Sequence, residues 1–139
     1  MRVAALLAIL AAPAAALTEA ELAADGYAVM DCLFKQRCVI GKPCEPAWRD
    51  VRWMLSDAAG KAYQVHRGGK IWGPSVLMKD DRWADTSEAR AILSPMRRAV
   101  AAHLTVFDGG GAIWSHQYAA NPGSGQFYTG TCALPEAGE

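Results

Sequence analysis

The segment Asp50-Val51-Arg52-Trp53-Met54-Leu55-Ser56 carries the clearest structural pattern in the chain. Its odd-numbered residues, Val51, Trp53 and Leu55, are apolar and fall on one face of an extended backbone, while the even-numbered residues fall on the other. Alternation with a period of two residues is typical of a β-strand that buries one face. Residues 50–56 therefore predict a strand that contributes one face to a core.

Short segments of similar character extend on both sides of this strand, separated by residues that favour turns. Glycine, proline and aspartate mark the turns because they adopt or support tight backbone bends. Strands are expected at Tyr27–Lys35, Lys61–Arg67, Lys70–Trp72, Ser75–Lys79, Arg98–Phe107, Ala112–Tyr118 and Gln126–Thr131. Turns are expected at Asp57–Gly60, Gly68–Gly69, Asp80–Arg82 and Asp108–Gly111, and Gly73-Pro74 is expected to break one strand from the next.

Two segments fit more than one structure. Thr18 and Glu21 match a capping box for a short helix over residues 19–25, which competes with a frayed N-terminus. Residues 85–94 fit either a helix that begins near Asp85 or a strand over residues 89–93. With either choice, about six to eight short strands and Gly-rich turns predict an all-β fold, a small antiparallel barrel or sandwich. Pairing of the first and last strands would close the sheet.

The N-terminal segment predicts an export signal. Met1-Arg2 is a positive start, residues 3–12 are uncharged and apolar, and Ala14-Ala15-Ala16 supplies the small residues that a signal peptidase reads. The apolar run is too short to span a bilayer, which takes about 20 residues. We therefore expect a signal peptide over residues 1–16 and a single domain over residues 17–139. The protein is expected to be periplasmic or secreted, with no membrane span after signal removal.

The composition argues against some classes of partner. The chain has 139 residues and zero formal net charge, with 14 basic and 14 acidic residues. Nucleic-acid-binding domains usually carry a basic excess, so no nucleic-acid partner is expected. The hydrophobic fraction of 52% excludes intrinsic disorder as the main state.

The four cysteines fit an exported domain. Cys32, Cys38 and Cys44 are separated by five residues each, and Cys132 lies near the C-terminus. An even number of cysteines in a small exported protein is typical of structural disulfides, and these spacings do not match a zinc site. Cys132 can bond any of the other three. We predict the pairs Cys32–Cys132 and Cys38–Cys44, the second closing a small loop.

No residue pattern predicts a catalytic site, a metal or a cofactor. His103 and His116 are the best metal candidates, because a two- or four-residue turn between their strands would place them opposite each other. A three-residue turn would separate them, and we interpret them as polar residues on a solvated sheet face. Ser115, His116 and Asp108 do not form a triad, since adjacent strand residues point to opposite faces. A small hydrolase or metal-binding protein that uses the histidine pair remains the enzyme alternative.

The best sequence indication of a binding site is the set of five tryptophans. Trp53 belongs to the predicted core, whereas Trp72 and Trp83 fall near strand ends. Aromatic side chains at loop edges can stack on sugar rings or fill a pocket of a protein partner. We therefore expect a non-catalytic binding or interaction module whose partner is a protein or glycan of the cell envelope.

The export signal, the cysteine cluster and the ending Tyr128-Thr-Gly-Thr-Cys132 after a Gly-turn hairpin resemble small cysteine-containing secreted bacterial proteins of unknown function. That likeness covers most of the mature chain and implies no activity. Locally, Ser124-Gly125-Gln126-Phe127-Tyr128 resembles the S-G-x-x-Y loop of membrane-bound and periplasmic C-type lysozyme inhibitors. This resemblance implies a disulfide-tied β-barrel in which Ser124 enters the lysozyme cleft, and it makes Tyr128 of the same motif a possible binding residue. The Trp/Lys-Gly stretch that follows the loop in that family is missing, because the chain soon reaches Cys132.

Overall fold

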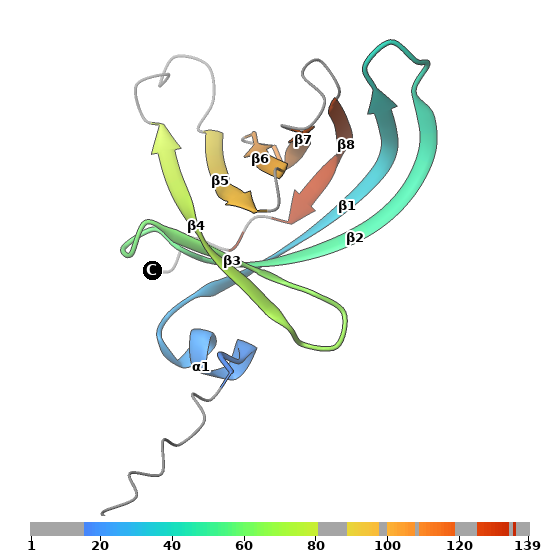
Figure 1. Ribbon diagram of the computed structural model, residues 1–139. Coiled ribbons are helices and arrows are strands. Elements are labelled where there is room, and N and C mark those ends of the chain that lie inside the picture. The colour runs from blue at the N-terminus through green and yellow to red at the C-terminus, as the bar shows by residue number, and fades with distance from the viewer. Residues whose placement is uncertain are drawn as a thin grey trace, which may run out of the picture.

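The chain folds into eight antiparallel strands and one short helix in the computed structural model, which describes residues 16–80, 89–97, 100–107, 109–118, 125–133 and 135. Each strand pairs with the next, and β1 pairs with β8, so the sheet closes into a barrel (Figure 1). The all-β expectation is confirmed as a barrel, and the first and last strands pair as predicted. The elements are α1 (Glu19–Ala24), β1 (Ala28–Val39), β2 (Glu45–Ser56), β3 (Lys61–Val65), β4 (Ile71–Asp80), β5 (Ala89–Arg97), β6 (Val100–Val106), β7 (Gly111–Tyr118) and β8 (Gly125–Ala133).

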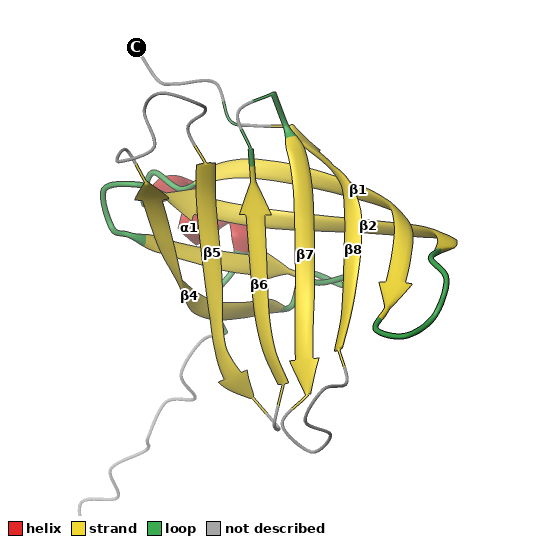
Figure 2. Cartoon of the chain, turned by 90° about the horizontal axis from the view of Figure 1, so that it is seen from above, coloured by secondary structure: helices red, strands yellow, loops and turns green. Residues whose placement is uncertain are grey.

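The core lies between two groups of strands. Figure 2 shows β4 to β8 side by side, with β1 and β2 crossing behind them. An eight-stranded barrel is just wide enough for side chains to fill its interior. The inward apolar residues form one buried cluster that includes Met30, Phe34, Val51, Trp53, Leu55, Leu77, Ile92, Leu104, Val106 and Trp114.

Helix α1 lies against the outer face of β2, where the apolar residue Met54 would otherwise be exposed. The helix begins at the predicted capping box, in which Thr18 Oγ1 accepts a hydrogen bond from the Glu21 N–H and the Glu21 carboxylate accepts one from the Thr18 N–H. It contacts β2, and both Leu22 and Met54 are buried outside the barrel core. The short helix expected over residues 19–25 is therefore confirmed.

Strand β4 runs through Gly73-Pro74, so the predicted break between two strands is wrong. The pairing of β3 with β4 shifts between Ala62 and Gln64, which accommodates the irregularity within one strand. Gly73 lets the Tyr63 ring approach the backbone, since a Cβ at Gly73 would lie 2.7 Å from Tyr63 Cδ1. Of the predicted turn at Asp80–Arg82, Asp80 belongs to β4 and the rest lies outside the described residues.

The ambiguous segment over residues 85–94 contains a strand. Residues 89–94 belong to β5, which pairs with β4 and β6, so the strand alternative is confirmed there. Residues 85–88 lie outside the described part of the chain. The apolar Ile92 on this strand is fully buried in the core.

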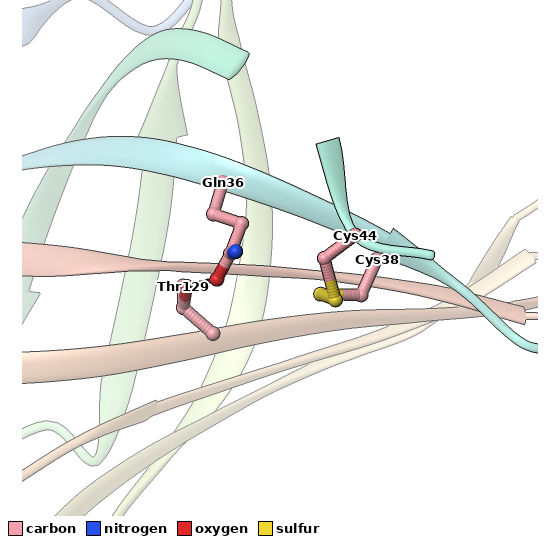
Figure 3. The surroundings of a disulfide bond; sticks show 4 residues. All are labelled: Gln36, Cys38, Cys44 and Thr129. Carbon is pink, nitrogen blue, oxygen red and sulfur yellow. Dashed lines mark hydrogen bonds between the residues drawn. A yellow bond between two sulfur atoms is a disulfide. The ribbon is translucent and has the colours of Figure 1, made fainter. Parts of the chain in front are cut away.

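An irregularity at Lys35 exchanges the two faces of β1. Before it, Phe34 is buried inside the barrel; after it, Gln36 points outward and accepts a hydrogen bond from Thr129 of β8 at 3.3 Å (Figure 3). An extra residue in one strand turns every later side chain to the opposite face. Arg37 therefore takes the inward position that Gln36 would otherwise occupy.

Both predicted disulfides are confirmed. Cys32 and Cys132 lie directly opposite each other on β1 and β8, are almost fully buried, and join the strands that close the barrel. Cys38 and Cys44 close the β1–β2 turn on the outer face, near Gln36 (Figure 3). Cys32 and Cys38 are six residues apart and would share a face in a regular strand. Because the irregularity at Lys35 lies between them, Cys32 points into the barrel and Cys38 points outward.

Candidate functional site

The barrel wall has a gap beside the first half of β2. Strand β2 has 12 residues and β3 has 5, and β3 pairs with β2 only over Arg52–Ser56. The chain leaves β3 through the turn His66–Lys70, which is closed by a 2.8 Å hydrogen bond from the His66 N–H to the Lys70 carbonyl. No strand in the described part of the chain pairs with the outer edge of Glu45–Val51. We call the opening between Glu45–Val51 and the His66–Lys70 turn the notch.

The notch contains an open groove of about 1030 Å³. Its lining includes inward residues such as Arg49, Val51 and His66 together with outward residues such as Trp48 and Asp50. The groove therefore reaches from the outer surface of β2 to the barrel interior. Pockets in this size range hold small molecules or segments of a partner.

Arg49 lies at the inner end of this groove. It pairs with Phe34 across β1 and β2, so its side chain follows the inward face of the sheet. The guanidinium carbon lies 4.8 Å from the Trp114 ring centroid and 5.2 Å from that of Tyr128. Arg49 Nη1 also donates a hydrogen bond to Tyr128 Oη at 3.2 Å. These contacts hold a solvent-accessible cation against buried aromatic faces.

The aromatic surface beneath Arg49 is continuous. The Phe34 and Trp114 rings are 5.5 Å apart, Trp114 and Tyr128 are 5.8 Å apart, and His116 stands edge-on to Trp114 at 4.4 Å. Offset and edge-to-face rings at these separations stabilise each other and fix their orientations. We call Arg49, Phe34, Trp114, His116 and Tyr128 the Arg49 cluster.

The two histidines nearest to Arg49 are held in the neutral form. Burial, and then the positive charge of Arg49, lower the pKa of His116 to about 4. The pKa of His66 is also lowered, first by burial, then by the positive charge of Arg49 and then by that of Lys70. Both imidazoles are therefore neutral near pH 7, and Arg49 supplies the positive charge of this region.

Several buried nitrogen atoms at and near the cluster have no hydrogen-bond partner among the described residues. They include His116 Nε2, Trp114 Nε1 and His66 Nε2. The Trp114 indole N–H is a donor only, and Trp114 is 3% exposed. A buried donor without a partner costs about 1–3 kcal/mol, so a bound acceptor would recover free energy here.

Arg49 has no carboxylate partner among the described side chains, whereas Arg37, which also points inward, has one. Arg37 Nη1 lies 2.8 Å from Glu45 Oε1, and Arg37 Nε donates to Gln126 Oε1 at 2.8 Å. Gln126 in turn donates to Tyr118 Oη at 2.8 Å. The charge of Arg37 is thus compensated within the protein, whereas the contacts of Arg49 with described residues are to aromatic rings and the Tyr128 hydroxyl, with neutral imidazoles nearby.

The outer rim of the notch carries its own ion pairs. Arg52 Nε lies 2.7 Å from Asp31 Oδ1, and Arg52 Nη1 lies 3.0 Å from Glu19 Oε1 of α1. The hydrogen bond from Arg52 lowers the pKa of the Asp31 carboxyl. Trp48 is 72% exposed beside this rim, with Lys35 Nζ 6.0 Å from its ring centroid.

Of the two registers considered for this hairpin, the structure has the one that separates His103 from His116. His103 pairs with Ser115, and His116 pairs with Ala102, because the turn between β6 and β7 shifts the register by one residue. His103 is therefore exposed on the outside, while His116 belongs to the interior. Ser115 Oγ donates to the His103 carbonyl at 3.2 Å. The described residues contain no group of three or more metal-ligating side chains.

The other predicted binding residues have different outcomes. Trp72 is 43% exposed and stacks on His66 at 4.2 Å between ring centroids, next to the turn that borders the notch. Tyr128 lies inside the barrel as part of the Arg49 cluster. Trp83 and Ser124 lie outside the described residues, as does Asp108 of the rejected triad.

Sequence reasoning missed Arg49 as a site residue. It precedes the alternating segment over residues 50–56 and has the parity of Val51 and Trp53, which was the available signal for an inward position. The notch itself depends on how far β3 extends, which no residue pattern indicated.

Comparison with known proteins finds no matching protein family, curated protein or solved structure. Among the described residues, no helix is long and apolar enough to cross a membrane.

Proposed function

We propose that the protein is a non-catalytic binding module and that its ligand places an anionic group on the Arg49 cluster. The observation that carries this proposal is the uncompensated guanidinium of Arg49, held over Trp114 and Tyr128 at the inner end of an open groove. A carboxylate or phosphate is the group that an arginine fork binds best. Arg49 is the member of the cluster that lines the groove, and the buried, unpartnered Trp114 Nε1 and His116 Nε2 lie behind it.

We also propose that the protein acts after export, as a periplasmic or secreted protein whose partner belongs to the cell envelope. Two disulfides are compatible with an oxidising compartment. The helix α1 begins at Glu19, just after the predicted cleavage site between Ala16 and Leu17. Expression of the full chain in a bacterial host, followed by fractionation and intact-mass measurement, should find a periplasmic product consisting of residues 17–139. An uncleaved cytoplasmic product would contradict export.

The anion site is tested by thermal unfolding of the mature domain with acetate, citrate, inorganic phosphate and N-acetyl-aspartate at constant ionic strength and pH. A ligand that binds only the folded state raises its stability, by about 2.7 kcal/mol at one hundred times Kd. At least one of these anions should raise the Tm of the native protein, and Arg49→Gln should abolish the increase.

The matched control is Lys61→Gln, which removes a positive charge from an exposed side chain of β3 that does not line the groove. It should retain the anion response, because Lys61 lies outside both the groove and the Arg49 cluster. The proposal is wrong if none of the four anions stabilises the protein, or if the two variants lose the response equally.

A further inference from the structure

We propose that the ligand is an extended peptide segment of a partner protein, which pairs as an additional strand with the free edge of β2 over Glu45–Val51. This inference rests on the proposed binding role of the notch and adds the chemical class of the ligand.

The edge of β2 is a template for another strand. Along one edge, β2 pairs with β1 from Glu45 to Leu55. Along the opposite edge, pairing with β3 begins only at Arg52, so Glu45–Val51 has no neighbour there among the described strands. In a strand, the N–H and C=O groups of alternate residues point to opposite sides. Every second residue of this segment therefore directs its backbone groups into the notch, where they can pair with an incoming chain.

The surroundings of this edge fit one extended chain better than a second sheet. A strand that pairs with Glu45–Val51 would continue the path of β3, which turns away at His66–Lys70. The groove is bordered on the far side by residues of this turn, including His66, Arg67 and Gly69. An extended peptide brings only its own strand to this edge, whereas a second copy that paired through its own β2 edge would also have to fit its barrel against the turn.

The geometry also predicts a side-chain pattern for the peptide. Side chains of paired strands that lie opposite each other share a face of the sheet. The peptide residue opposite Arg49 would face the Arg49 cluster, and an Asp, a Glu or a terminal carboxylate suits that position. The residue opposite Trp48 would face outward, where an apolar side chain can cover the 72% exposed indole.

The probe is a peptide selected from a display library of random dodecapeptides with free C-termini, using the native mature domain as bait. The selected peptide is synthesised, and its affinity is measured by isothermal titration calorimetry. Analogues that carry a single backbone N-methyl group at each position in turn are then compared. Backbone pairing predicts a loss with a period of two residues, about fivefold to tenfold at each residue whose N–H faces β2. Amide hydrogen exchange should slow over Glu45–Val51 when the peptide binds.

The inference is overturned if the library yields no binder, if the N-methyl losses show no period of two, or if exchange slows elsewhere and not over Glu45–Val51. Arg49→Gln and the control Lys61→Gln separate this result from the proposed anion site. If the periodic loss persists but Arg49→Gln binds the peptide as well as the native protein does, the edge pairing stands and the anion site fails. If anions stabilise the protein through Arg49 but the periodic loss is absent, the anion site stands and the edge pairing fails.

Discussion

The neutral state of His116 gives a quantitative prediction for the pH dependence of stability. The pKa of this imidazole falls from 6.5 to about 4 on folding, first because of burial and second because of Arg49. The unfolded chain therefore binds a proton between pH 6.5 and pH 4 that the folded protein does not bind. Stability must fall as the pH falls through this window. Complete burial would make this difference about 3 kcal/mol, and the partial exposure of His116 reduces it to about 1–2 kcal/mol.

The assay is urea unfolding of the native protein and of His116→Gln between pH 7 and pH 4. The glutamine keeps a polar side chain but does not titrate, so the variant should lose about 1–2 kcal/mol less stability across this range than the native protein. His103→Gln changes the outward histidine of the same hairpin and serves as the matched control. Proton chemical shifts of the imidazole should give a pKa of about 4 for His116 and a higher value in Arg49→Gln. A native His116 that titrates near 6.5 would show that burial and Arg49 do not hold its imidazole neutral.

Three further comparisons test how the barrel is held together. Replacing both cysteines of Cys32–Cys132 with alanine should lower the free energy of unfolding by about 4–5 kcal/mol in the loop-entropy model, and the same change at Cys38–Cys44 by about 2–3 kcal/mol. The difference arises because the bonded cysteines are 100 and 6 residues apart. Equal losses in urea unfolding would contradict this order. Gly130→Ala should cost about 1–3 kcal/mol, since its Cβ would lie 2.6 Å from Phe34 Cα. Gly109→Ala, with open space around it, should change the free energy of unfolding by less than about 0.5 kcal/mol, and a similar loss from both would contradict the packing argument. Thr18→Ala should cost about 1 kcal/mol through the lost cap, whereas an unchanged midpoint in urea would show that α1 does not contribute to stability.

The fold was predictable from local patterns where those patterns were regular. The alternation over residues 50–56 and the glycine turns indicated strands that the structure contains, and the cysteine positions indicated both disulfides. The predicted break at Gly73-Pro74 was wrong because the pairing of β3 with β4 tolerates a register shift at this point, where the Tyr63 ring packs against Gly73. That packing depends on a neighbouring strand, which local sequence does not reveal.

The site was less predictable, because it depends on relations between strands. Tyr128 and His116 were identified as candidates, but the turn that decides whether His116 faces His103 or the interior could be of either register. Arg49 carries no motif, and its role comes from Trp114, which lies 65 positions away in the chain. The irregularity at Lys35 likewise decides which side chains of β1 enter the barrel, and no residue type requires it.

The proposed function depends on an anionic group binding on the Arg49 cluster inside the notch. The most direct measurement is a titration of the ¹⁵N-labelled mature domain, followed by its amide and indole signals, with the anion that stabilises it most. Binding on the cluster should give the largest shifts at the backbone N–H of Arg49 and the indole N–H of Trp114, and these shifts should be lost in Arg49→Gln. Shifts confined to the outer face, for instance at Trp48 and Ile113, with the Trp114 signal unmoved, would rule out an anion site on the cluster.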